Sequence, residues 1–246
     1  MTRVIVNGAK GKMGAMTVQF VQADPELTLV GETDRGDNLL DEIRRTKAQV
    51  VVDFTNASVG YDNFLTILEG GAHPVVGTSG FNKEQVATLG AICREKKIGA
   101  LIAPNFAIGA VLMMKFAKEA AKYMPHVEIV EGHHEQKLDA PSGTAIRTAE
   151  LIREGMGEVE PAPERGEELI RGSRGGRASG IPVHAIRLPG IVAQERVIFG
   201  DVGQTLVLEH TSINRECFMS GVCIAAKKIV GTTDLLYGLE ELIFRD

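Results

Sequence analysis

The segment VIVNGAKGKMG (residues 4–14) decides the fold, because an apolar run of strand length passes directly into a glycine-rich turn. After the turn, apolar residues recur at helical spacing at Met13, Met16, Phe20 and Val21. A strand, a glycine turn and a helix in this order form the context of a dinucleotide-binding motif. The glycine spacing is GxxGxxG rather than GxGxxG, so the motif needs support from the next strand and from the acidic residue after it.

Short apolar runs alternate with helix-period segments up to about residue 104. We expect strands at 4–6, 27–31, 50–54, 74–77 and 98–103, and helices that begin near 13, 58 and 82. The three valines at 50–52 show no two-residue alternation, which is typical of a strand covered on both faces. This part of the chain therefore predicts an α/β domain with a Rossmann-type parallel sheet.

The pattern changes after a helical stretch at about 109–124. Strands are expected at 127–131, 181–188, 191–199 and 204–210, with turn signals between the last three. They predict a second, α+β domain with a mixed, mostly antiparallel sheet. The segment 158–180 is rich in Pro, Gly, Glu and Arg, and we expect a mobile surface loop there. Final helices are expected at about 215–229 and 234–244.

Composition excludes several classes of protein. The net charge of −5 over 246 residues argues against a general affinity for nucleic acid or anionic membranes. The uncharged stretch 98–114 contains Pro104 and two glycines, so we expect a strand, a turn and a helix start instead of a membrane span. The three cysteines are scattered and form no CxxC, which argues against a disulfide framework. With no signal-peptide pattern at the start, we expect a cytoplasmic protein.

A second segment, EGHHEQKLDAPSGTA (residues 131–145), carries acid-base groups and a predicted anion site. Histidine titrates near neutral pH, and the proton affinity of lysine is tuned by its surroundings. Pro-Ser-Gly-Thr (141–144) predicts a helix start, whose unpaired N–H groups attract carboxylate or phosphate. His133, His134, Lys137 and the helix start therefore predict a site for a small, negatively charged substrate.

Two other chemistries are disfavoured. An HExxH zinc motif that began at His134 would need histidine at 138, where the chain has Leu138, so no metal site is predicted. No cysteine lies beside a candidate base in the sequence, which argues against a cysteine-dependent aldehyde dehydrogenase.

Several polar groups come directly after predicted parallel strands, where the carboxyl ends of the strands face the ligand crevice. Asp34 lies twenty residues after Gly14 and is placed to meet ribose hydroxyls, which favours NADH. The guanidinium of Arg35 is suited to the extra phosphate of NADPH, so we expect both cofactors to be used. Segments 77–80 and 103–106 come after two further strands, and the Asn105 amide is expected to hold the nicotinamide carboxamide or to link the domains.

Taken together, the 131–145 segment, the glycine turn, 77–80, 103–106, RLPG (187–190) and Phe199-Gly200 resemble the 4-hydroxy-tetrahydrodipicolinate reductase (dihydrodipicolinate reductase) family over essentially the whole chain. The 131–145 segment is a highly specific match. The resemblance implies an NAD(P)H-binding domain from 1–104 and 214–246, and a substrate-binding and tetramerisation domain from 105–213. It also implies reduction of 4-hydroxy-tetrahydrodipicolinate, via dihydrodipicolinate, to tetrahydrodipicolinate in the diaminopimelate route to lysine, by a homotetramer.

The resemblance also implies roles for single residues. His133 resembles the family's proton donor or acceptor, and Lys137 resembles its second proton donor. The groups that hold the two substrate carboxylates are then His134, Lys137, Ser142, Gly143 and Thr144. The cofactor contacts are Gly8, Ala9, Lys10, Gly11, Lys12, Met13, Asp34, Arg35, Gly77, Thr78, Ser79, Ala103, Pro104, Asn105 and Phe106. Ser79 stands where threonine is common, and Asp34 replaces a glutamate, which leaves the preference between NADH and NADPH open.

Two alternatives remain. One is another two-domain NAD(P)H-dependent oxidoreductase that acts on a different small carboxylate, which a panel of substrates would reveal. The other is a dinucleotide-binding sensor without turnover. The paired proton donors His133 and Lys137 argue against the sensor, since a binding protein has no need of them.

Overall fold

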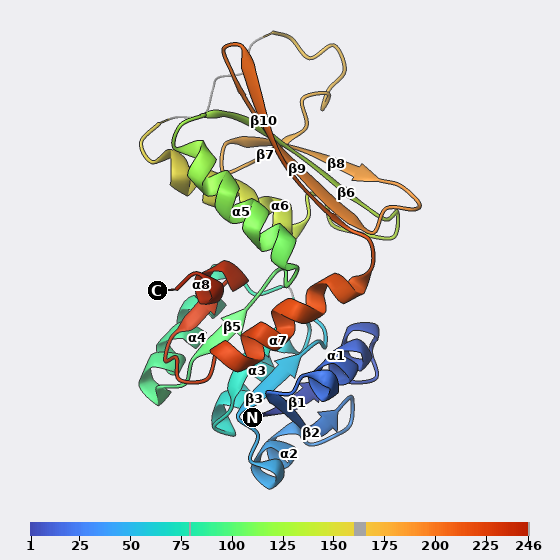
Figure 1. Cartoon of the computed structure of the whole chain (residues 1–246), viewed down its shortest axis with the longest axis vertical. Helices are drawn as coiled ribbons and strands as arrows, with labels where there is room; N and C mark the ends of the chain where they lie inside the picture. Colours follow the sequence, from blue (N-terminus) through green and yellow to red (C-terminus); the bar gives the residue numbers. More distant parts are fainter. Residues whose placement is uncertain (79, 160–165, 246) are drawn as a thin grey trace. The chain divides into compact units, whose positions relative to one another are not determined.

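The computed structural model describes residues 1–78, 80–159 and 166–245, and the chain divides into two compact units (Figure 1). The first unit consists of Met1–Ile108 and Arg215–Asp246, and the second of Gly109–Asn214. The boundaries expected from sequence were 104/105 and 213/214.

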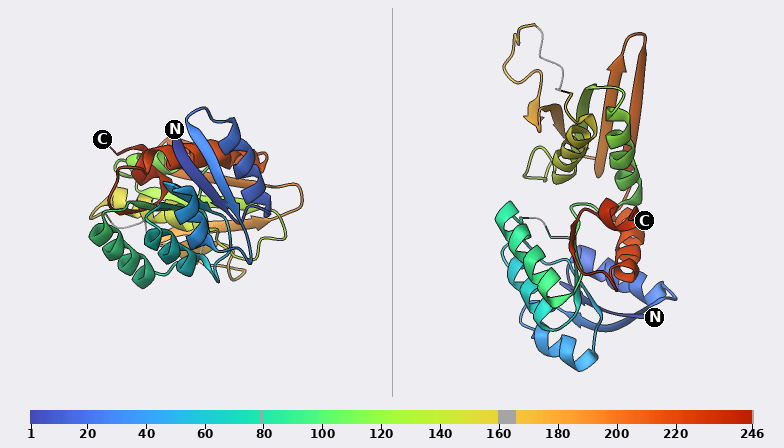
Figure 2. Two further views of the ribbon diagram at one scale, coloured as in Figure 1. Left: turned by 90° about the horizontal axis from the view of Figure 1, so that it is seen from below. Right: turned by 90° about the vertical axis from the view of Figure 1, so that its left-hand side faces the viewer.

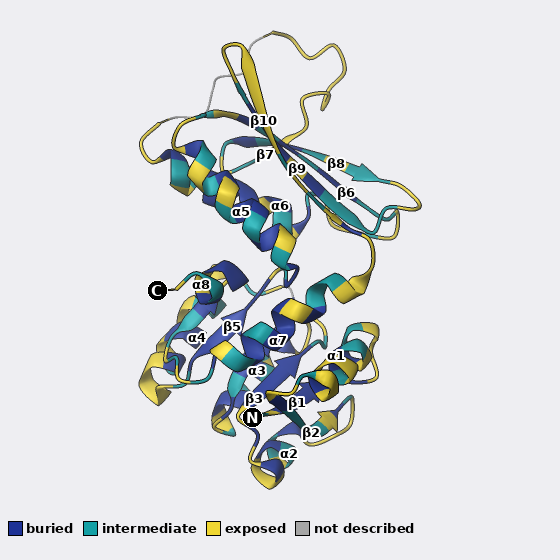
Figure 3. Ribbon diagram, in the orientation of Figure 1, coloured by how far each residue is buried: buried dark blue, intermediate teal, exposed yellow. Residues whose placement is uncertain are grey.

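The first unit contains a six-stranded sheet in the order β11-β5-β4-β3-β1-β2, in which every neighbouring pair is parallel. Its strands are β1 (Thr2–Asn7), β2 (Leu27–Thr33), β3 (Val50–Asp53), β4 (His73–Val76), β5 (Ala100–Ile102) and β11 (Leu235–Tyr237). The three valines of β3 are buried, as their unbroken apolar run predicted, and Asp53 at the end of the strand is buried as well (Figure 3). The predicted Rossmann-type parallel sheet is confirmed, and the strand order reverses at β1, which lies between β2 and β3.

Helices cover both faces of this sheet (Figure 2). On one face α1 (Lys12–Ala23) packs against α7 (Met219–Lys228), which comes after the short helix η1 (Arg215–Phe218) and contacts α8 (Leu239–Ile243). On the other face α3 (Gly60–Glu69) packs between α2 (Leu39–Thr46) and α4 (Lys83–Lys96). The helix predicted to begin near 82 is capped by Asn82, whose side chain accepts from the Gln85 N–H.

Two elements of the first unit differ from the sequence prediction. The helix expected over 234–244 is wrong in its first part, because Leu235–Tyr237 pair with Ala100–Ile102 as the edge strand β11. Helix α2 was not predicted. It is short and highly charged, and its apolar contribution to the core is confined to Leu39 and Ile43.

The second unit contains a five-stranded sheet in the order β10-β9-β6-β8-β7. Its strands are β6 (His126–His133), β7 (Gly176–Ala178), β8 (Ile181–Arg187), β9 (Ala193–Asp201) and β10 (Gln204–Ser212). Among the described strands of this sheet only the β6–β8 pair is parallel, so the predicted mixed, mostly antiparallel sheet is confirmed. Helices α5 (Ile108–Ala121) and α6 (Gly143–Met156) pack closely, since a Cβ on Gly155 would lie 2.1 Å from the Lys118 carbonyl oxygen.

The segment 158–180, expected to be a loop, contains a strand that was not predicted. Residues 160–165 lie outside the described residues, but Gly176–Ala178 form strand β7. The Glu168 carboxylate accepts from the N–H groups of Gly172 and Arg174, and Arg174 pairs with Glu128 on β6. A three-residue strand without an apolar pattern gives no signal in the sequence, which explains why β7 was missed.

The uncharged stretch 98–114 forms β5, a turn and the start of α5, as expected. Within the described ranges, no helix combines the length and the apolar character that crossing a bilayer requires.

Candidate active site

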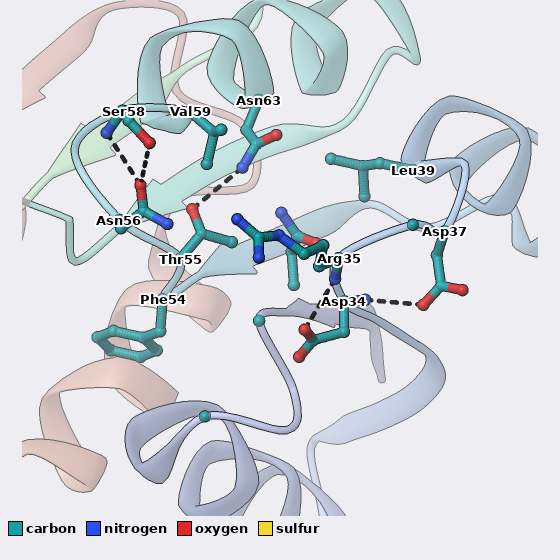
Figure 4. Close-up of a pocket in the computed structure, with 14 residues that line it drawn as sticks. Asp34, Arg35, Asp37, Leu39, Phe54, Thr55, Asn56, Ser58, Val59 and Asn63 are labelled. Carbon is teal, nitrogen blue, oxygen red and sulfur yellow. Dashed lines mark hydrogen bonds between the residues drawn. The ribbon is translucent and has the colours of Figure 1, made fainter.

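A cavity of about 440 Å³ lies in the first unit where the strand order reverses (Figure 4). It is lined by residues at the carboxyl ends of β1, β2 and β3 and at the start of α3, which is the ligand position expected for an open parallel sheet. Four predicted cofactor contacts line it: Gly8, Gly11, Asp34 and Arg35. The other lining residues are Asn7, Gly36, Asp37, Leu39, Phe54, Thr55, Asn56, Ser58, Val59 and Asn63.

The glycine turn is shaped by close backbone contacts. Gly8 has a φ of +81°, and a Cβ there would lie 2.8 Å from the carbonyl oxygen of Phe54. A Cβ on Gly14 would lie 2.0 Å from the carbonyl oxygen of Gly8. The turn therefore packs against the end of β3, and α1 packs against the turn. Because no side chain caps α1 at its N-cap residue Gly11, its first N–H groups are suited to a phosphate group.

Asp34 and Arg35 border the cavity at the end of β2. The Asp34 carboxylate accepts from the N–H of Arg35 at 2.7 Å and from the N–H of Lys10 at 2.8 Å, and these hydrogen bonds lower the pKa of Asp34. Each carboxylate oxygen keeps lone-pair capacity for a further donor, such as a ribose hydroxyl. A carboxylate and a guanidinium group therefore border the same cavity.

A buried polar network at the same edge of the sheet was not predicted from sequence. Asp53, fully buried at the end of β3, accepts from the side-chain amides of Asn7 at 3.0 Å and Asn63 at 2.9 Å. Its other oxygen accepts from the Thr55 hydroxyl at 2.6 Å. Asn7 and Asp53 each end a buried strand. In the sequence each of them is a polar residue directly after an apolar run, and this pattern could have indicated the network. The network joins the ends of β1 and β3 beneath the cavity.

The described residues of the segments after β4 and β5 lie outside the cavity lining, whereas Gly8 and Gly11 of the glycine turn belong to it. Gly77, Thr78 and residues 103–106 do not line the cavity, nor do Ala9, Lys10, Lys12 and Met13, and Ser79 lies outside the described residues. Gly77 and Phe106 nevertheless contact the cavity wall, because Phe54 lies against both. A Cβ on Gly77 would lie 2.2 Å from the Phe54 ring, and the Phe54 and Phe106 rings meet edge to face at 5.8 Å. The Asn105 side chain accepts from the Ala107 N–H at 2.8 Å.

In the second unit, Glu131 organises the acid-base segment. This fully buried carboxylate binds Arg187 through two hydrogen bonds of 2.8 and 2.9 Å. It also lies 2.7 Å from Nδ1 of His133 and accepts from the Ser142 N–H at 3.1 Å. One carboxylate therefore connects the predicted proton donor, the predicted helix start and a cation from β8. No role was predicted from sequence for Glu131 or Arg187.

The charge of Glu131 results from these contacts. Burial raises the pKa of Glu131, but hydrogen bonds from His133 and Arg187, together with their charges, outweigh burial and lower it to about 2. The carboxylate is therefore ionised at neutral pH. Because it holds Nδ1 of His133, the other ring nitrogen, Nε2, is left for proton transfer.

The remaining predicted substrate residues lie in the turn after β6 and at the start of α6. Nζ of Lys137 pairs with Asp139 at 2.8 Å, and its backbone N–H donates to the His134 carbonyl. Arg187 donates to the Asp139 carbonyl at 2.7 Å, which ties this turn to Glu131. Ser142 caps α6 by accepting from the Ala145 N–H, and Gly143 and Thr144 form the first turn of that helix. The helix predicted from Pro-Ser-Gly-Thr is confirmed.

The chain matches two family models that together cover almost its whole length. Residues 2–106 match the model described as dihydrodipicolinate reductase, N-terminus, and residues 109–243 match dihydrodipicolinate reductase, C-terminus. The 4-hydroxy-tetrahydrodipicolinate reductase of Legionella pneumophila (strain Lens) is 48% identical over 98% of this chain and 99% of its own length. The protein of that name from Streptococcus gordonii is 49% identical, again over 98% of this chain and 99% of its own length.

Solved structures agree with these matches. A dipicolinate-bound dihydrodipicolinate reductase from Paenisporosarcina sp. TG-14 is 38% identical, with a TM-score of 0.86 over 99% of this chain and 100% of that one. An amine dehydrogenase from Mycobacterium smegmatis, 12% identical with a TM-score of 0.68, shares the fold alone. With family models over both parts of the sequence and full-length relatives at this identity, the chain belongs to the dihydrodipicolinate reductase family.

Proposed function

We propose that this protein reduces 4-hydroxy-tetrahydrodipicolinate, via dihydrodipicolinate, to tetrahydrodipicolinate with NADH or NADPH, in the diaminopimelate route to lysine. The observation that carries the proposal is the full-length similarity to relatives of that name, at 48 and 49% identity. The cluster around Glu131 supports it independently, because it joins a histidine, a lysine-bearing turn and a helix N-terminus within one unit.

The first unit has groups that fit a nicotinamide dinucleotide. The uncapped start of α1 suits the pyrophosphate, and Asp34 suits the ribose hydroxyls. Arg35 offers a guanidinium for the phosphate that distinguishes NADPH, which supports use of both cofactors. When bound, the cofactor supplies the hydride. The segments 77–79 and 103–106 complete the proposed cofactor contacts, as the family resemblance implies.

The second unit has groups that fit a cyclic dicarboxylate, the class of molecule named in the Paenisporosarcina structure. We assign its carboxylates to His134, Lys137 and the helix start at Ser142, Gly143 and Thr144, where the N–H groups of Gly143 and Thr144 are the backbone donors, because a dianion needs cations and N–H donors. After hydride addition the electron-rich ring must be protonated at carbon. Nε2 of His133 donates this proton, and Lys137 stabilises the charge that develops toward the ring nitrogen.

We further propose that the protein is a homotetramer in the cytoplasm. On the face of the second sheet opposite Glu131, the apolar side chains of Ile186, Ile198 and Val207 are not buried within one chain. Such a face is suited to contact between copies. Cys93, Cys217 and Cys223 are not joined in disulfides in the described part of the chain, which fits a reducing compartment. Light scattering of the purified protein tests the assembly, and a monomer at micromolar concentration would refute it.

The activity is tested by supplying purified protein with the freshly made product of pyruvate and aspartate semialdehyde condensation, and measuring oxidation of NADH and of NADPH separately. We expect oxidation with both. If neither is oxidised while a panel of other small carboxylates supports turnover, the alternative oxidoreductase is correct. Dinucleotide binding without turnover of any substrate would instead indicate a sensor.

A further inference from the structure

A second buried carboxyl group lies beside Glu131, and the reaction proposed above gives it no role. Glu195 on β9 is directly opposite Glu131 in the antiparallel pairing of β6 and β9. Glu195 is 4% exposed and Glu131 is fully buried. Residues directly opposite in a sheet point to the same face, so both carboxyl groups enter the same interior. Two negative charges so placed repel each other strongly, and one of the two groups must keep its proton.

The two carboxyl groups have very different surroundings. Glu131 receives four donors, two from Arg187 and one each from His133 and the Ser142 N–H. Glu195 has the Thr148 hydroxyl as its hydrogen-bond partner, while its Oε1 finds no partner among the described residues. Within the described part of the chain, the cation contacts of this pair therefore belong to Glu131.

The groups that face Glu195 from neighbouring strands do not supply a cation. On β10 the residue opposite Glu195 is His210, and burial lowers the pKa of that histidine, which favours its neutral form. On β6 and β8 the charged groups near the pair, His133 and Arg187, are both bound to Glu131. An ionised Glu195 would thus be an unpaired charge in an apolar interior.

The hydroxyl of Thr148 determines the direction of its hydrogen bond to Glu195. This hydroxyl donates to the Thr144 carbonyl oxygen at 2.9 Å. A hydroxyl has one hydrogen, so while that hydrogen is given to Thr144 the hydroxyl can only accept from Glu195. An accepting hydroxyl suits a protonated Glu195, whereas a hydroxyl that donated to Glu195 would lower the pKa of this carboxyl group. The chain of hydrogen bonds ends in the first turn of α6, where the proposed carboxylate site lies.

We propose that Glu131 and Glu195 share a single proton that resides on Glu195, so that the one negative charge of the pair stays on Glu131 and holds His133 by Nδ1. Glu131 is then a positioning residue that acts through His133. This inference rests on the proposed function, in which His133 gives a proton to carbon. In that step the Nε2–H bond of the imidazolium breaks, a C–H bond forms on the ring, and a neutral imidazole remains on Glu131.

Three variants test the proposal. Glu131→Gln removes the charge, and Glu195→Gln fixes that position in the neutral state. Glu128→Gln is the matched control, because Glu128 also lies on β6 and accepts from a histidine and an arginine, His184 and Arg174, but with a half-exposed carboxylate. Circular dichroism verifies that each variant is folded.

The first readout is infrared absorption at pH 6, which detects a protonated carboxyl group without substrate or cofactor. We expect a carboxylic-acid band in the wild type and in Glu128→Gln that is absent in Glu195→Gln. Nitrogen-15 NMR of His133 should show a proton on Nδ1 in the wild type. Absence of the acid band, or an unprotonated Nδ1, overturns the proposal even if Glu131→Gln fails to fold.

The second readout is turnover. We expect kcat to fall on the order of 100-fold in Glu131→Gln, with unchanged NADH affinity, because glutamine donates to Nδ1 and selects the wrong tautomer. At pH 6 both Glu195→Gln and Glu128→Gln should keep kcat within about threefold of the wild type. Near-normal kcat in Glu131→Gln overturns the positioning role. A wild type that does not turn over the substrate refutes the proposed function instead, and the infrared and NMR results still decide where the proton lies.

Discussion

Replacing Glu195 by glutamine should change how the stability of the folded protein depends on pH. Burial, as the largest cause, and the nearby charge of Glu131 raise the pKa of Glu195 from its ordinary 4.5 to about 7. The folded state therefore holds this proton more tightly than the unfolded state does. Its stabilising effect is fully present below pH 4.5 and is lost as the pH rises through 7. Glutamine cannot ionise, so the variant has no such loss.

The magnitude is set by the interval between the two pKa values. At about 1.36 kcal/mol for each pH unit, the interval from 4.5 to about 7 corresponds to about 3 kcal/mol. Most of this loss of stability occurs between pH 5 and pH 8. Over that range the free energy of unfolding of Glu195→Gln should rise relative to the wild type by about 2 to 3 kcal/mol.

The assay is urea-induced unfolding at pH 5, 6, 7 and 8, monitored by circular dichroism because the chain contains no tryptophan. Glu128→Gln is again the control, since its half-exposed carboxylate should give a difference from the wild type that stays constant with pH. If the wild-type and Glu195→Gln stabilities ran parallel from pH 5 to pH 8, Glu195 would not be a buried neutral acid.

Three further predictions concern the cofactor and substrate groups. Gly14→Ala places a Cβ 2.0 Å from a backbone carbonyl oxygen, so unfolding should become easier by on the order of 2 kcal/mol and calorimetric NADH affinity should fall. Arg35→Ala should raise the KM for NADPH about tenfold and leave that for NADH nearly unchanged, and equal effects on both would contradict a phosphate contact. His133→Gln and Lys137→Ala should each lower kcat about 100-fold or more while NADH still binds, and near-normal turnover in both would refute the assigned roles.

The parallel sheet was predictable from sequence because its strands are buried on both faces and appear as unbroken apolar runs, as in Val50–Val52. The edge strand β11 was not, because Leu235–Tyr237 is also compatible with one turn of an apolar helix. Its strand conformation comes from pairing with Ala100–Ile102, more than 130 residues earlier in the chain. Gly238, with a φ of +104°, marks the end of that strand, and a glycine inside the expected helix was the available warning.

Some residues of the candidate site were likewise predictable from sequence, and others were not. His133, Lys137 and the helix start at Ser142 lie within one short segment, so their residue types and spacing were visible together. Glu195 and Arg187 come to Glu131 only through the register of β9 and β8 against β6, which no local pattern specifies. Yet Arg187, together with His133, keeps Glu131 ionised, and the ionised carboxylate forms the hydrogen bond to Nδ1 of His133. Proton transfer should therefore respond to a substitution of Arg187 on β8 that leaves the acid-base segment intact.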